Sequence, residues 1–464
     1  MPIPMSVTSS VSTKNLPVVP RYKSLLGSML LAANPIPILN SYLDTYGDTL
    51  ILYIGGVRPT LLTRDPGLVQ HILQKNHRNY PKSEFSHGIA RYLGHGLLTS
   101  EGSYWLQQRR LIQPGFHRQR VAGLVEVMQA EINECLKPLE RQLGQEEGAV
   151  EVAVHKLMTN TAFRIIARST FSTNINNAEL EQMSALLTAI QAFYVRTIRQ
   201  PYLRPWLSLR NQFQQHDKLA SELREMVRGY VRQRQQTAGS YDDLLQMLLD
   251  VRYEDTGEPM TEEQVVDEAL ILLVAGHETS ANALSWMWYL LAQHPQVVTR
   301  MRTEMTQVLD GRSASFADLP NLGYSLQIVQ ETMRLYPPAW IVDRVAQEDD
   351  SYNGISLPKG TLVSAYLLGI HHAPSLWQDA ETFRPERFAP EQMKQQPPYA
   401  YIPFGGGPRL CIGNQFALTE MQLVLLEMLR RFEVDWVEQP PIQLQPLITL
   451  RPRQEIRLQF RKRS

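Results

Sequence analysis

One feature constrains the fold of this chain more than any other: helical character extends over residues 261–294. Thr261 and Gln264 form a capping box at its start, and Pro295 ends it because proline cannot continue a helix. At 1.5 Å per residue such a helix is roughly 50 Å long, enough to cross a whole domain. Its middle, residues 269–275, is apolar on every side, which predicts a helix buried in the core.

Polar residues interrupt this helix directly after its apolar middle. They are Gly276, His277, Glu278 and Thr279. Such residues are unfavourable in a dry helix core, because a buried polar group without a partner costs free energy. A polar interruption at the centre of a buried helix therefore requires an explanation.

Most of the remaining chain has apolar residues at three- and four-residue spacing, which is typical of amphipathic helices. The clearest segments are residues 124–143, 179–198, 219–235 and 418–432. Two segments have the pattern of β-hairpins, residues 49–63 around Gly55-Gly56 and residues 355–364 around Pro358-Lys359-Gly360. We expect a mainly α fold with small β-sheets (α+β), formed by a flexible segment at residues 1–20 and a single large domain at residues 21–464.

Composition limits the binding partners and the cellular compartment that we expect for the protein. Lys and Arg together number 46, as do Asp and Glu, so no bulk charge favours nucleic acid. The two cysteines, Cys135 and Cys411, cannot form a disulfide framework, which fits a reducing compartment. The apolar patch at residues 25–33 is far shorter than the roughly 20 residues that span a bilayer. With no pattern of a secretory signal, we expect a cytoplasmic protein without a membrane anchor.

Cys411 follows a glycine-rich loop, Gly405-Gly406-Gly407, and precedes a predicted helix. Glycines allow main-chain N–H groups to approach a bulky flat partner closely. Those N–H groups and the helix N-terminus stabilise a thiolate. The alternative is that Cys411 is a small buried apolar residue, the more common role of a single cysteine.

The segment around Cys411 resembles the haem-binding signature of the cytochrome P450 superfamily. The resemblance covers every defining position: Phe404, Gly407, Arg409, Cys411 and Gly413. It implies that haem b (iron protoporphyrin IX) binds here, with Cys411 as the ligand of the iron. It also implies that the long helix lies over the haem.

Three further segments resemble motifs of the same family, in the same order along the chain. Glu331 and Arg334 match its Glu-x-x-Arg motif, and Arg387 matches the third member of a buried structural network. A buried guanidinium requires a carboxylate partner, so these three would lock the core behind the cysteine loop. The resemblance also implies residues that bind the haem propionates, which are Trp105, Arg109, Arg344, Arg409 and, less firmly matched, His95.

The polar interruption of the long helix resembles the family's oxygen-activation segment. There Ala275 and Gly276 would leave room for dioxygen, and the catalytic pair Glu278 and Thr279 would deliver protons. Two alternatives stay open. Glu278 could be satisfied by a neighbouring arginine, and Thr279 could bond back to its own helix.

The resemblance implies a haem-thiolate monooxygenase that uses O2 to hydroxylate or epoxidise a small lipophilic substrate. Electrons would come from a ferredoxin or flavodoxin with its NAD(P)H-dependent reductase, because the chain has no flavin or iron–sulfur motif. By the same resemblance the substrate pocket would be formed by residues 83–97, 193–207, 270–279, 339–343 and 447–449. A peroxygenase or isomerase, and a haem sensor without turnover, are the competing hypotheses.

Overall fold

The computed structural model describes residues 16–24, 34–54, 58–83, 88–145, 148–172, 175–237 and 241–463. Residues 1–15, the patch at residues 25–33 and the Gly55-Gly56 turn thus lie outside the described residues. The chain divides into two compact units, one formed by residues 1–86, 341–380 and 397–410 and the other by the rest. Within the described part of the chain, no helix combines the length and apolarity that a membrane crossing requires.

The first unit contains a four-stranded sheet with the strand order β1-β2-β7-β4. Strands β1 (Thr49–Ile54) and β2 (Arg58–Thr63) pair in antiparallel register, which confirms the first predicted hairpin. Strand β2 then pairs in parallel with β7 (Leu362–Ala365), and β7 pairs in antiparallel with β4 (Val342–Val345). Helical elements of this unit include α2 (Ile36–Tyr46), α3 (Pro66–Gln70), η1 (His71–Lys75), η2 (His77–Asn79), α17 (Leu367–His371) and η8 (Gly407–Arg409).

The second predicted hairpin is wrong. Strand β6 (Ile355–Leu357) pairs with β5 (Asp350–Tyr352), whereas β7 belongs to the four-stranded sheet. The β5–β6 turn is Asn353-Gly354, and both residues have positive φ angles, 47° and 80°. This is the two-residue turn whose twist matches a hairpin. Gly360 also has a positive φ, and its N–H bonds to Ala346, so the chain after Pro358 turns away from β6.

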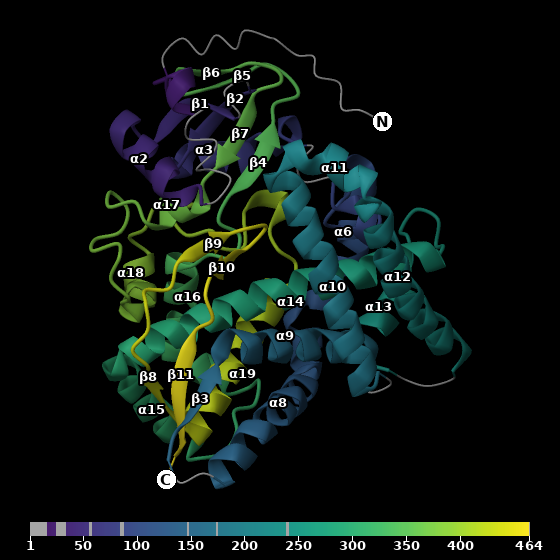
Figure 1. Cartoon of the computed structure of the whole chain (residues 1–464), viewed down its shortest axis with the longest axis vertical. Coiled ribbons are helices and arrows are strands. Elements are labelled where there is room, and N and C mark those ends of the chain that lie inside the picture. The colour runs from purple at the N-terminus through teal and green to yellow at the C-terminus, as the bar shows by residue number, and fades with distance from the viewer. Residues whose placement is uncertain are drawn as a thin grey trace. The chain divides into compact units, whose positions relative to one another are not determined.

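The second unit is built around α14 (Glu262–Gln293), the predicted long helix. Its capping box, formed by Thr261 and Gln264, is present, and Pro295 starts the next helix. Helix α14 is buried along residues 265–274 and again along residues 280–288. It packs along α9 (Val154–Phe171), and the two lie side by side in Figure 1.

The four amphipathic segments are helices α8 (Val125–Gln145), α10 (Asn177–Arg199), α12 (Gln212–Gln236) and α19 (Asn414–Arg431). Each places its apolar stripe in the core, for example Met128, Ile132 and Leu139 of α8. The other helical elements of this unit are α5 (Ala90–Leu93), α6 (Gly102–Ile112), η3 (Gln113–Phe116), α7 (Arg118–Gly123), η5 (Pro201–Leu203), α11 (Arg204–Leu209), α13 (Leu244–Asp250), α15 (Pro295–Leu309), η6 (Leu319–Asn321), α16 (Gly323–Leu335), η7 (Pro385–Phe388) and α18 (Pro390–Met393).

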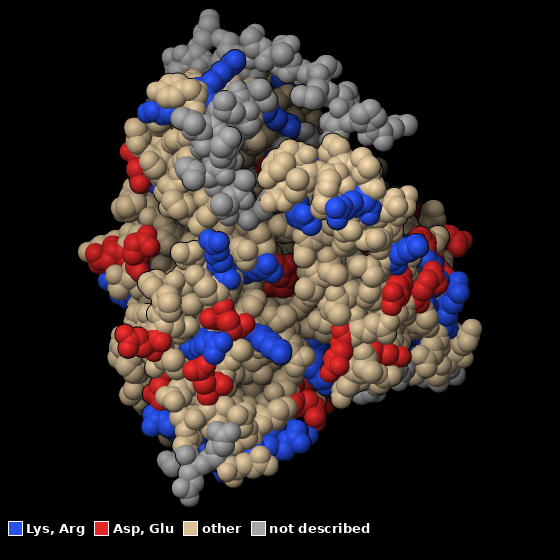
Figure 2. Space-filling view, in the orientation of Figure 1, with Lys and Arg blue, Asp and Glu red and all other residues tan. Residues whose placement is uncertain are grey.

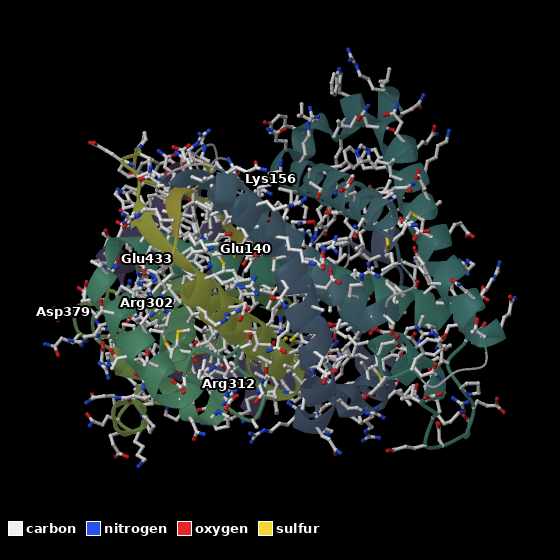
Figure 3. All side chains as sticks on the ribbon, turned by 90° about the horizontal axis from the view of Figure 1, so that it is seen from below. Glu140, Lys156, Arg302, Arg312, Asp379 and Glu433 are labelled. Atoms are coloured by element: carbon white, nitrogen blue, oxygen red, sulfur yellow. The ribbon has the colours of Figure 1, made fainter. Side chains whose placement is uncertain are left out.

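Two small sheets complete the second unit. Strand β11 (Arg457–Lys462) lies between β3 (Val150–Ala153) and β8 (Phe432–Trp436), and β9 (Leu444–Pro446) pairs with β10 (Leu450–Pro452). Helix α15 is tied to β8 by an ion pair between Arg302 and Glu433, which Figure 3 labels. On the face shown in Figure 2, basic and acidic side chains are interspersed, in keeping with their equal numbers.

Candidate functional site

The chain passes from the first unit to the second between Leu410 and Cys411. In the first unit, the glycine-rich loop has a positive φ of 64° at Gly407. A Cβ atom there would overlap the carbonyl oxygen of Leu73. Both the backbone angle and the close approach therefore require glycine. Phe404 and Arg409, on either side of Gly407, are half-buried.

The start of this loop is held by a residue to which the sequence analysis assigned no role. His371 is fully buried, and its Nε2 accepts a hydrogen bond of 3.0 Å from the N–H of Ile402. The ring also packs at 5.4 Å against that of Tyr401. His371 thus anchors the segment that leads into the glycines. Nothing in its local sequence predicts this contact, because the partner lies 31 residues away.

Cys411 stands three residues before the start of α19, in the second unit. Its side chain is exposed, yet burial raises the pKa of its thiol, while the N–H of Gly413 and the charge of Arg109 act in the opposite direction. The exposed thiol therefore lies near Arg109 and near the N–H of Gly413. Arg109 is the predicted propionate ligand, and the structure brings it close enough to act on this sulfur.

The surroundings of Gly413 show whether a flat group fits beside the sulfur of Cys411. Its φ of −86° is open to any residue. The protein atoms nearest to a Cβ there would be Phe116 Cε1 at 3.9 Å and Cys411 Sγ at 4.0 Å. Neither the backbone nor the packing of the chain thus requires glycine. A side chain at this position would fill the space beside the sulfur, which is where a haem would lie, so the residues fit the group.

Helix α6 carries Trp105 and Arg109 one turn apart. Trp105 is buried and Arg109 is half-buried, with Nε donating to Gln113 Oε1 at 2.9 Å. Burial lowers the pKa of Arg109, and the nearby Cys411 opposes that effect. Two other predicted propionate ligands, Arg344 and His95, interact with neighbouring protein groups. Arg344, on β4 of the first unit, donates to the carbonyl of Asp343 at 2.8 Å, and the exposed His95 stacks on Tyr104 with ring centroids 5.1 Å apart.

The predicted buried stretch of α14 ends one residue early. Residues 269–274 are buried as predicted, but Ala275 is exposed, and Glu278 and Thr279 are half-exposed. Ala275 and Thr279 share one face of the helix, since they are four residues apart. Gly276 has a different role: a Cβ there would lie 2.8 Å from Ile166 Cγ1 of α9, so glycine allows the two helices to pack closely.

The hydrogen-bond partners of Thr279 and Glu278 bear on the two alternatives that the sequence analysis left open for these residues. Thr279 Oγ1 donates to the carbonyl of Ala275 at 2.6 Å, so it does bond back to its own helix. Glu278 Oε1 accepts a hydrogen bond of 2.6 Å from Thr449 Oγ1 rather than from an arginine. His277 is buried against Phe163, and burial lowers its pKa to about 4, so its ring is neutral at pH 7.

Glu331, Arg334 and Arg387 meet in the core of the second unit. The Glu331 carboxylate accepts from Arg334 Nε at 2.7 Å and from Arg387 Nε at 3.2 Å. It also accepts from the N–H of Arg384 at 2.9 Å. Glu331 and Arg334 have no exposed surface and Arg387 has little. The triad fixes α16 to the segment that contains η7.

Comparison with known proteins agrees with this geometry. The family model for cytochrome P450 matches residues 17–460. A cyclooctatin synthase of Streptomyces melanosporofaciens is 33% identical over 430 residues, covering 91% of this chain and 90% of that protein. A cyclooctat-9-en-7-ol 5-monooxygenase of the same organism is 31% identical over 412 residues, covering 88% and 87%.

A solved structure, the haem domain of cytochrome P450DA, shares the fold. Its TM-score is 0.86 at 24% sequence identity, and the match covers 97% of this chain and 98% of that one. The matched family domain and the curated relatives define a monooxygenase that carries haem. The chain belongs to the cytochrome P450 family.

Proposed function

We propose that Cys411 binds the iron of haem b as a thiolate, and that the protein inserts one atom of O2 into a lipophilic substrate by hydroxylation or epoxidation. The observation that carries the proposal is the accessible Cys411 thiol beside Arg109 and Gly413, at the start of α19. Bound haem with a thiolate ligand supplies cleavage of the O–O bond and oxygen transfer to the substrate.

The side chains around this site have distinct roles in the proposal. Trp105, Arg109, Arg344 and Arg409, with His95, would hold the two propionates, since guanidinium groups suit carboxylates. Phe404, Gly407 and Gly413 would leave the cysteine loop free to approach a flat group. Ala275 would leave room on the open face of α14.

Glu278 and Thr279 would handle protons. The Thr279 hydroxyl proton is already donated to Ala275, so in any further hydrogen bond its oxygen can only accept. Thr279 would thus orient a water molecule by accepting its hydrogen bond. Glu278 is half-exposed and would pass protons from solvent to that water.

The substrate and the electron donor are inferred from chemistry. The central stretch of α14, residues 270–274, is wholly apolar and favours a lipophilic ligand, as do relatives named for oxidation of cyclooctat-9-en-7-ol and formation of cyclooctatin. A ferredoxin or flavodoxin with its NAD(P)H-dependent reductase would supply electrons. A cytoplasmic location remains a prediction from the sequence.

The test compares the two cysteines of the purified protein. The reduced carbon monoxide complex should absorb at the long wavelength diagnostic of thiolate ligation, and Cys411→Ala should abolish that band. Cys135→Ala is the matched control: Cys135 is buried in α8, and burial raises the pKa of its thiol to about 11. If both variants behave alike, Cys411 is not the ligand. In a separate assay, formation of product from O2 and an electron donor would distinguish a monooxygenase from a haem sensor.

A further inference from the structure

The turn between β9 and β10 is hydrogen-bonded to α14 through the side chain of Thr449. Thr449, the last residue of this turn, is 7% exposed. Its hydroxyl accepts a hydrogen bond of 2.9 Å from Asn282 Nδ2 and donates one of 2.6 Å to Glu278 Oε1. A hydroxyl has one proton, so the bond from Asn282 directs that proton to the carboxylate.

The spacing on α14 makes this arrangement specific. Glu278 and Asn282 are four residues apart and lie on one stripe of the helix, next to the stripe of Ala275 and Thr279. Asn282 is fully buried, so its amide has a fixed direction. The carboxylate of Glu278 is consequently held on the side of α14 that faces the turn.

The turn is itself fixed to its surroundings. Trp340 Nε1 donates to the carbonyl of Leu447 at 3.1 Å, and the N–H of Leu450 donates to Pro338 at 2.9 Å. Between these two anchors, Ile448 remains 42% exposed, although it is a large apolar residue. The same turn therefore presents an apolar side chain and holds an acid.

We propose that Thr449 is a positioning residue for proton delivery, which keeps the Glu278 carboxylate in place and couples it to the turn that carries Ile448. This inference rests on the proposed function. A substrate that contacts the turn would set the position of Thr449, and through it the path by which Glu278 supplies protons. Substrates that move the turn would be oxidised with more loss of electrons to hydrogen peroxide.

The first test observes the carboxylate directly. The infrared difference spectrum between the wild-type protein and Glu278→Gln isolates the Glu278 band. In the Thr449→Val background this band should shift, because valine has the same shape but no hydroxyl, and Thr449→Ser should restore it. Thr170→Val is the matched control, since Thr170 is fully buried and its hydroxyl donates to the carbonyl of Ile166 in its own helix α9. An unshifted band in Thr449→Val would overturn the proposal.

The second test separates positioning from binding. With a ligand that changes the haem spin state, Thr449→Val should keep its affinity within about twofold and lower the ratio of product to reductant by about fivefold, as for the loss of one hydrogen bond. Thr449→Ser should recover most of the ratio. In the Glu278→Gln background the valine change should have no further effect. An equal effect in both backgrounds would show that Thr449 acts without Glu278.

These tests also distinguish failure of the inference from failure of the proposed function. Loss of thiolate ligation concerns Cys411 and its carbon monoxide band. The infrared band of Glu278 is read without turnover, so it reports on Thr449 whether or not Cys411 proves to be the ligand.

Discussion

Ser280 Oγ donates a hydrogen bond of 2.6 Å to Glu420 Oε2, and this bond joins α14, one residue after Thr279, to α19, nine residues after Cys411. Both side chains are buried. Burial raises the pKa of Glu420 to about 8, so its carboxyl group is largely neutral at pH 7. A neutral acid therefore links α14, which carries Glu278 and Thr279, to α19, the helix that follows Cys411.

We expect Glu420→Gln to flatten the pH dependence of stability. Because the pKa of the carboxyl is raised on folding, its contribution is complete below about pH 4.5 and is lost as the pH rises toward 8. Between these values, the wild-type free energy of unfolding should fall by up to about 1.4 kcal/mol per pH unit more steeply than that of the variant. Urea unfolding at several pH values measures the two slopes. Parallel slopes would mean that Glu420 is ionised throughout.

Glu331→Gln should strongly destabilise the fold. Removing the charge leaves Arg334 and Arg387 buried without an anionic partner, at a cost of about 3–5 kcal/mol in the free energy of unfolding. Glu391→Gln is the control, since Glu391 and Lys394 form an exposed pair with the same spacing. That change should cost less than about 1 kcal/mol. Equal losses in the free energy of unfolding, measured by denaturant titration, would show that the triad does not stabilise the fold.

Gly94→Ala should cost more stability than Gly102→Ala. Both glycines have a positive φ, 84° and 64°, so alanine is strained by about 1–2 kcal/mol at either position. Only at Gly94 would the added Cβ also overlap the carboxylate of Asp267, whereas nothing lies within 4 Å at Gly102. Thermal unfolding should rank the variants in this order. The reverse order would show that the loop moves away from α14 at little cost.

We propose that the basic residues of α6 and α7, among them Arg118 and Arg120, attract an acidic redox protein. Arg118 should then matter more than Arg120 for reduction. Arg120 is paired with Asp242 at 2.6 Å, while Arg118 lies over the ring of Phe316. Arg118→Glu should slow reduction at low salt and weaken its salt dependence. Arg120→Glu should change it less, because Asp242 already offsets that charge. Stopped-flow measurements of the reduction rate at several salt concentrations test this difference between the two variants. If neither change affects the rates, the partner binds elsewhere.

Thr279→Ala should fold and bind haem normally, because the lost hydroxyl donates to the carbonyl of Ala275 in its own helix. It should lose control of proton delivery, so that electrons form hydrogen peroxide and the ratio of product to reductant falls several-fold. Measuring hydrogen peroxide together with the reductant consumed gives the share of electrons that is lost to peroxide. An unchanged ratio would remove Thr279 from proton delivery and leave the haem assignment intact.

Local sequence signals predicted the elements that have local causes. The capping box and Pro295 bound α14 because both act within one helical turn. The Asn353-Gly354 turn carried an equally local signal that the predicted hairpin at residues 355–364 overlooked. Contacts such as Ser280 with Glu420, or His371 with Ile402, join residues far apart in sequence and leave no periodic trace.

Strand β11 also has a consequence for how this protein is made. Arg457 of β11 and Glu151 of β3, which form an ion pair, are 306 positions apart. At about 5–20 residues per second, a ribosome needs roughly 15–60 seconds between synthesising the two strands. During that time β3 has no partner strand from β11. The nascent chain must therefore keep an unpaired edge from aggregating until translation is nearly complete.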